Sequence, residues 1–189
     1  MDTEEYLLMI LSDGNLPTGA FVASAGLESY IKHGHPPGAS ATAPMTTVNF
    51  MRDSLQTYAH SALPFARDAH QLAETYKNQA ELLLDSSFKS IAELDDLYDK
   101  MTLNHVARRA SKTQGVALLT LYSRGFTRPA YLGAADESSE ARETKNRIGS
   151  LIDKLKLSIR RGDIQGHLPI CWGVLTASLE LSVGKFAQN

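Results

Sequence analysis

Apolar side chains recur at steps of three and four residues along most of the chain, which is the spacing of amphipathic helices. The clearest stripes lie within residues 48–59, 91–101, 103–124 and 148–159. The segment that starts near Leu168 is apolar on nearly all sides, so we expect that helix to lie in the core or in an interface. Alternating strand patterns bounded by hairpin turns are absent. The pattern predicts an all-α fold, a single-domain irregular bundle of about seven to nine helices over residues 1–189.

Capping and breaker residues predict where the helices begin and where the chain leaves them. Ser90 followed by Glu93 is a capping box, which predicts a helix start at Ser90. Pro64 suits the first turn of another helix. Two stretches near residues 33–45 and 129–140 are rich in loop-forming residues and lack periodicity, so we expect mobile loops there.

Composition and charge exclude several classes of protein. The 189 residues are 43% hydrophobic and 21% charged, which is ordinary for a globular domain. The net charge of −2 leaves no basic excess for a phosphate backbone. No apolar stretch approaches the ~20 residues of a membrane span, the first residues are acidic where a secretory signal is basic, and the one cysteine forms no internal disulfide. We therefore expect a cytoplasmic protein that binds neither nucleic acid nor membrane.

Candidate metal ligands are few. His33 and His35 would hold a divalent ion only with a third ligand, and none lies close in sequence, so a solvated loop is favoured and the pair stays a weak candidate. His167 and Cys171 stand four residues apart, but Pro169 between them indicates that a helix only begins there. We expect His167 at or before the helix cap and Cys171 as a small buried apolar group.

Candidate catalytic groups are fewer still. The sequence has no phosphate-binding glycine loop and no Gly-x-Ser-x-Gly elbow. The adjacent carboxylates Asp95 and Asp96 are interpreted as part of a solvated helix face. Gly115 lies inside a predicted helix, where it costs about 1 kcal/mol relative to Ala, so a close backbone contact is expected at this position.

Three motifs follow one another along the chain. The first is a turn and helix start formed by Pro17, Gly19, Ser24, Gly26, Leu27 and Glu28, with Tyr30 just behind. The second is a helix that carries Arg108, Arg109, Ser111, Gln114 and Gly115. The third is His167 and Pro169 followed by an apolar, glycine-containing helix. In this order, from Leu11 to about Leu181, the motifs resemble those of the UreF family of urease accessory proteins.

The resemblance implies an all-helical, non-catalytic protein of urease maturation. Family members join UreD (also called UreH) and the GTPase UreG in the complex that inserts nickel into the urease apoprotein. The resemblance implies that the chain bridges UreD/UreH and UreG, modulates GTP hydrolysis by UreG and forms a homodimer. It also implies that no cofactor is stably bound, because nickel passes through the assembled complex by a tunnel.

The motif residues are therefore candidates for partner contacts or for the nickel tunnel. We expect Glu28, Tyr30, Arg109 and Gln114 to make functional contacts, because charged and amide groups on a tight helical surface need partners. Intramolecular caps and salt bridges are the alternative. Family members usually continue past this region through another helix and an Arg-x-x-Pro-Leu-Gly-Gln-like segment that helps to bind UreD. This sequence ends at Asn189, so we expect a C-terminally truncated member.

Two other classes of function stay open. One is a metal-storing nickel chaperone that uses His33 and His35, with His167 and Cys171 as further ligands. The other is a helical enzyme with an unrecognised acid–base pair, which needs such a pair to converge in a pocket.

Overall fold

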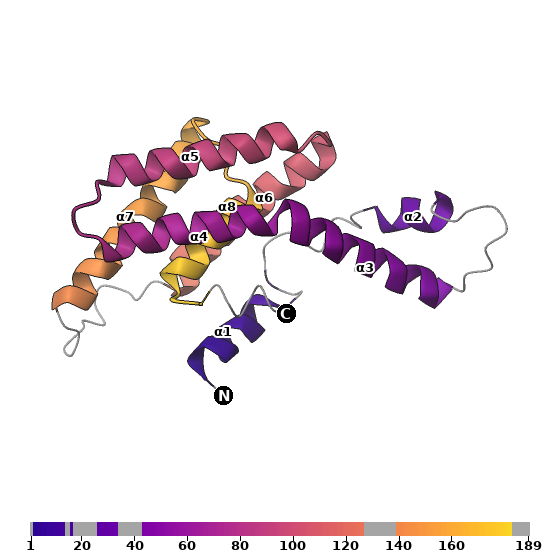
Figure 1. The fold of residues 1–189 in the computed structure, drawn as a ribbon, viewed down its shortest axis with the longest axis horizontal. Helices are drawn as coiled ribbons and strands as arrows, with labels where there is room; N and C mark the ends of the chain where they lie inside the picture. The colour runs from indigo at the N-terminus through magenta and orange to yellow at the C-terminus, as the bar shows by residue number, and fades with distance from the viewer. Residues whose placement is uncertain (1, 14–15, 17–25, 34–42, 127–138, 183–189) are drawn as a thin grey trace.

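The computed structural model describes residues 2–13, 16, 26–33, 43–126 and 139–182. These residues form helices and no strands, which confirms the predicted all-α fold (Figure 1). The elements are α1 (Thr3–Leu11), α2 (Leu27–His33), α3 (Ala43–Ser61), α4 (Leu63–Asn78), α5 (Leu84–Met101), α6 (His105–Leu121), a π-helical turn (Tyr122–Phe126), α7 (Ser139–Arg161) and α8 (Leu168–Ser178). Within this part of the chain, no helix is long and apolar enough to cross a membrane.

Helix α8 is the central element of the bundle. It contacts α4, α5, α6 and α7, and its side chains Ile170, Val174 and Leu175 are at most 2% exposed. A helix that is apolar on all sides has no face for solvent, so it is stable only when other helices surround it. The prediction that the segment after Leu168 lies in the core is confirmed.

Small residues let α8 approach α4 closely. A Cβ placed on Gly173 would lie 2.2 Å from the carbonyl oxygen of Ala66 and 2.8 Å from Ala69 Cβ. Ala69 and Ala73, on the same face of α4, are fully buried. The contact between these two helices therefore depends on the absence of a side chain at Gly173.

One buried polar pair crosses the same contact. His70 Nδ1 of α4 lies 2.9 Å from Thr176 Oγ1 of α8. The Thr176 hydroxyl donates to backbone carbonyls one turn earlier, so it accepts from a protonated Nδ1. Burial lowers the pKa of His70, an effect that the nearby Glu74 carboxylate opposes. The ring is therefore a neutral, hydrogen-bonded core group.

A single arginine ties α7 to the turn between α4 and α5. The Arg147 guanidinium donates hydrogen bonds to the carbonyl oxygens of Tyr76, Gln79, Ala80 and Leu82. It also lies 4.4 Å from the centre of the Tyr76 ring. The Tyr76 carbonyl belongs to the last turn of α4, which leaves it without a helical partner, and the other three carbonyls belong to the turn that follows.

The predicted helix boundaries have mixed outcomes. Pro64 occupies the first turn of α4, as predicted. The start predicted at Ser90 is wrong, because α5 begins at Leu84 and the Ser90 hydroxyl donates within the helix to the carbonyl of Ser86. Ser87 and Ile91 are both buried on one face of α5, so packing extends the helix upstream of the capping box.

The expected loops fall mostly outside the described residues. Residues 34–42 and 129–138 cannot be compared with the prediction. The remaining ends of the two segments lie in helices: His33 in α2, residues 43–45 in α3 and residues 139–140 in α7.

The first apolar stripe forms a helix but is not covered by the bundle. Helix α3 leads away from α4, and α2 lies beside it (Figure 1). Tyr30 of α2 packs edge-on against Phe50 of α3, with ring centres 5.3 Å apart. The side chains at Val48, Met51, Leu55 and Tyr58 are more than half exposed. Periodicity predicted this helix correctly, but none of the described residues covers these four side chains of the stripe.

Replacing Gly173 by alanine tests the close contact between α4 and α8. We expect Gly173→Ala to lower the free energy of unfolding by about 1–3 kcal/mol, because the new methyl group collides with the Ala66 carbonyl. Gly149→Ala in α7 is the matched control, since a Cβ there meets nothing within 4 Å. It should raise stability by about 0.5–1 kcal/mol, the ordinary gain of Gly to Ala in a helix. Urea unfolding of both variants measures this, and equal effects would contradict the proposed contact.

Candidate functional site

The second and third sequence motifs meet where α5, α6 and the start of α8 come together. We call this cluster the His167 junction and define it by Asp95 and Asp99 of α5, Ser111, Lys112 and Gly115 of α6, and residues 165–168. The cluster is held by hydrogen bonds between residues 53 to 72 positions apart in the sequence.

Asp95 receives three consecutive backbone N–H groups. Its Oδ2 accepts from Gln165 N at 2.7 Å and from Gly166 N at 3.0 Å, and its Oδ1 accepts from His167 N at 2.8 Å. The side chain is 1% exposed. The interpretation of Asp95 as part of a solvated face is therefore wrong, whereas its neighbour Asp96 is exposed and pairs with Lys100. The carboxylate avoids the cost of burial because hydrogen bonds replace water at both oxygens.

The His167 ring is fully buried and bonded at both nitrogens. Nε2 lies 2.9 Å from Asp99 Oδ1, and Nδ1 lies 3.1 Å from Ser111 Oγ. Leu168 N donates to the same Ser111 oxygen. Because the Asp99 carboxylate can only accept, Nε2 carries a proton and donates to it. His167 is the N-cap residue of α8, as the position of Pro169 predicted.

Asp99 forms ion pairs with two basic side chains of α6. Lys112 Nζ lies 2.8 Å and Arg108 Nε 3.7 Å from its Oδ1. Partial burial raises the pKa of Asp99, but hydrogen bonds from Lys112 and His167 and the two positive charges outweigh it, so the pKa is lowered. Lys112 Nζ also donates to Gln165 Oε1 at 2.5 Å. The carboxylate is thus ionised and joins α5, α6 and the segment before α8.

Gly115 makes the close contact that its position in a helix predicted. A Cβ there would lie 2.2 Å from the Gly166 carbonyl oxygen and 3.1 Å from Cys171 Sγ. Cys171 is 2% exposed, and burial, with a smaller contribution from the charge of Asp95, raises the pKa of its thiol. Cys171 is a buried apolar group, as predicted.

The junction contains a Ser–His–Asp chain, but its geometry favours a positioning role. A serine nucleophile needs a hydroxyl that is open to substrate and an imidazole that accepts its proton. Here the Ser111 oxygen is occupied by Leu168 N–H, and the imidazole is 0% exposed. Among the residues that the structure describes, no group of three or more His, Cys, Asp or Glu side chains is arranged to hold a metal ion.

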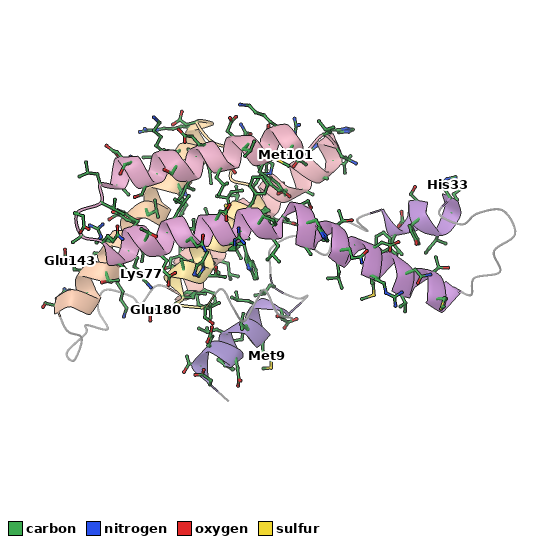
Figure 2. All side chains as sticks on the ribbon, viewed as in Figure 1. Met9, His33, Lys77, Met101, Glu143 and Glu180 are labelled. Atoms are coloured by element: carbon green, nitrogen blue, oxygen red, sulfur yellow. The ribbon has the colours of Figure 1, made fainter. Side chains whose placement is uncertain are left out.

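The predicted site residues are distributed over several parts of the chain. Pro17, Gly19, Ser24 and His35 lie outside the described residues. Gly26 and Glu28 are exposed at the start of α2, and Tyr30 donates to Asp53 of α3 at 3.2 Å. His33 is exposed at the end of α2, on the side of the molecule away from α7 (Figure 2). The described part of the first motif is therefore not brought to the His167 junction.

Some residues of the second and third motifs are buried in the bundle, and others are exposed on its surface. Gly115, His167 and Pro169 are buried inside the bundle, Ser111 and Arg108 are half-buried, and Arg108 Nε donates to the Thr102 carbonyl. On the same helix, Gln114 is half-buried and Arg109 is exposed. Arg108, Ser111 and His167 make intramolecular hydrogen bonds or ion pairs, whereas the partner contacts expected of Arg109 and Gln114 stay predictions.

Sequence reasoning missed Asp95, Asp99, Lys112 and Gln165. One signal was present for Asp95, which follows the core residue Ile91 by four positions and therefore falls on the buried stripe of its helix. A carboxylate on such a stripe indicates a buried hydrogen-bonded group. Asp99 continues the same spacing by one more turn.

Comparison with known proteins gives a consistent result. The family model described as UreF matches residues 42–188. Urease accessory protein 6 of Cryptococcus neoformans var. grubii is 33% identical over 205 residues, covering 96% of this chain and 65% of the relative. The urease accessory protein UreF of Corynebacterium efficiens is 27% identical over 180 residues, covering 95% of this chain and 62% of the relative.

A protein of Schizosaccharomyces pombe, named an uncharacterized urease accessory protein UreF-like, is 26% identical over 183 residues, covering 97% of this chain and 64% of the relative. The chain thus spans slightly less than two thirds of the length of the curated relatives it matches. No solved structure matches the chain.

Replacing Asp95 by asparagine tests the anchor of the junction. Asn presents an amide NH₂ where one carboxylate oxygen now accepts backbone N–H groups, so we expect a loss of about 1–3 kcal/mol in the free energy of unfolding. Asp96→Asn removes the adjacent, exposed charge and should change stability by no more than about 0.5 kcal/mol. Thermal or urea unfolding of the pair measures the difference, and similar losses in the two variants would contradict the assignment.

Proposed function

The chain belongs to the UreF family of urease accessory proteins, and we propose that it acts as a non-catalytic scaffold in urease maturation. In this proposal it bridges UreD/UreH and the GTPase UreG in the complex that inserts nickel into the urease apoprotein. It modulates when UreG hydrolyses GTP. Nickel is the cargo of the assembled complex and is not stored on this chain.

One observation carries the proposal: the match to the family model covers residues 42–188 and includes both motifs that meet at the His167 junction. The polar groups of that junction bond to one another. Asp95 accepts from the backbone N–H of His167, and the Ser111 hydroxyl bonds to the His167 ring and to Leu168 N at the start of α8. This arrangement favours a protein in which the second and third motifs build a rigid helical frame and exposed residues make the contacts with partners.

The exposed motif residues supply the proposed contact points. Arg109 is exposed on α6 and Glu28 is exposed at the start of α2, so each presents a charge that the bundle does not bury. Exposed apolar side chains on α3 offer further surface for a homodimer or a partner, since patches of this kind mark interaction sites. The proposed location is the cytoplasm.

Stepwise co-purification tests the scaffold function. Tagged chain is first combined with UreD, and UreG, GTP and magnesium are then added. We expect a defined ternary complex to be recovered from size-exclusion chromatography. Arg109→Glu should weaken recovery of one partner at least about tenfold, as a reversed charge at a contact does, while Arg160→Glu, an exposed arginine of α7, is the matched control.

The outcomes separate the proposal from its alternatives. If the wild-type chain recovers neither UreD nor UreG while a longer family member recovers both, the scaffold function is wrong for this chain. A nickel titration is run in parallel. Stoichiometric binding that is lost in the variant with His33→Ala and His35→Ala would instead support the metal-storing chaperone.

A further inference from the structure

Helices α4 and α5 form an open groove on the side of α5 that faces away from the His167 junction. The groove has a volume of about 640 Å³ and runs along the two consecutive helices and the turn between them. Its apolar lining is made of Leu72 from α4, Leu82 from the turn, and Leu94 and Leu97 from α5. Leu97 is 50% exposed, which is unfavourable for a large apolar side chain unless something covers it.

Most hydroxyl groups along the groove already donate hydrogen bonds within the chain. Thr75 donates to the carbonyl of Gln71, Ser86 to that of Leu83, and Ser90 to that of Ser86. Each of these bonds is made one turn back along the chain. The fourth hydroxyl-bearing residue of the lining, Ser87, is only 9% exposed. The groove therefore presents leucine side chains and hydroxyl groups that are bonded within the chain or little exposed, which suits an apolar side-chain row better than a sugar or a nucleotide.

The charge of the groove has one sign. Its charged lining residues are Asp68 on the α4 wall and Glu93 on the α5 wall. Their nearest cations are Arg67, 3.2 Å from Asp68, and Lys89, 3.9 Å from Glu93. All four side chains are about half exposed or more, and such surface pairs contribute little, so both carboxylates can pair with another cation.

We propose that this groove binds an amphipathic helix of another protein, one whose apolar stripe is flanked by lysine or arginine. Two adjacent helices leave a trough in which a third helix packs its side-chain ridge. Helix-in-groove recognition uses apolar anchors one helical turn apart, and the leucines along the two walls supply the complementary surface. A basic residue on either side of the stripe reaches Asp68 on one wall and Glu93 on the other. The inference stands on the groove alone and does not depend on the proposed function.

A designed peptide provides the first test. The probe is a fluorescein-labelled, alanine-based helix with leucines on one face and lysines on both sides of them. We expect saturable binding in fluorescence anisotropy, at least about tenfold tighter than for a peptide of the same composition in permuted order. A version with glutamates in place of the lysines should also bind at least about tenfold more weakly. Equal binding of all three peptides would overturn the proposal.

Paired variants of the chain locate the binding surface. Leu97→Glu should weaken binding of the lysine peptide at least about tenfold, whereas Leu103→Glu, at a leucine 86% exposed outside the groove, should not. Glu93→Lys should weaken it as well, and Asp163→Lys, an exposed acid in the turn before α8, is the control for the same charge change. Circular dichroism checks that each variant folds.

Two results would overturn the inference in different ways. A loss of peptide binding in Leu103→Glu equal to that in Leu97→Glu would show that the peptide adheres to exposed leucines in general. Self-association of the chain in sedimentation velocity that Leu97→Glu abolishes would assign the groove to a second copy of this chain, and not to a basic helix of another protein.

Discussion

The structure depends on the acceptance of three successive backbone N–H groups by Asp95. These groups belong to Gln165, Gly166 and His167, immediately before α8. The first turn of a helix leaves its N–H groups without helical partners, and a negative charge near that end is favourable. One carboxylate of α5 therefore satisfies the chain that leads into α8 and fixes where the helix begins. Because α8 contacts four other helices, their packing depends on this start.

The opposite end of α8 is held by a cation. Lys77 of α4, whose side chain is 10% exposed, donates to the carbonyl oxygen of Ala177 and lies 3.7 Å from Glu180 Oε1 (Figure 2). A positive charge is favourable at the C-terminus of a helix. Polar contacts at both ends of α8 therefore add to the close packing at Gly173 in fixing its position.

Periodicity predicted the helices well because each helix depends on neighbours in sequence. The helical stripe at 148–159 became the buried face of α7, with Ile148, Leu151 and Leu155 at most 3% exposed. Periodicity indicates which residues share a helix face but not which other element covers that face. For this reason the sequence predicted the helix α3 but not the exposure of its apolar side chains.

The junction was harder to predict because its partners are distant in sequence. Gly115 and His167 were each identified, one by a glycine inside a helix and the other by the following proline. Asp95 was misassigned because its three donors lie 70 to 72 residues away, and the spacing of residues within one helix cannot predict such distant contacts. The same geometry separates the motif residues into those that build the frame and those, such as Arg109, that remain outside it.

Amide hydrogen exchange of residues 165–167, measured by NMR on the native chain, tests the central role of Asp95 most directly. The account predicts that these three amides exchange as slowly as that of Val174 in the middle of α8, because they open only when the bundle around α8 opens. Exchange at the rate of an unprotected loop, with Val174 still protected, would show that α8 is positioned without this anchor.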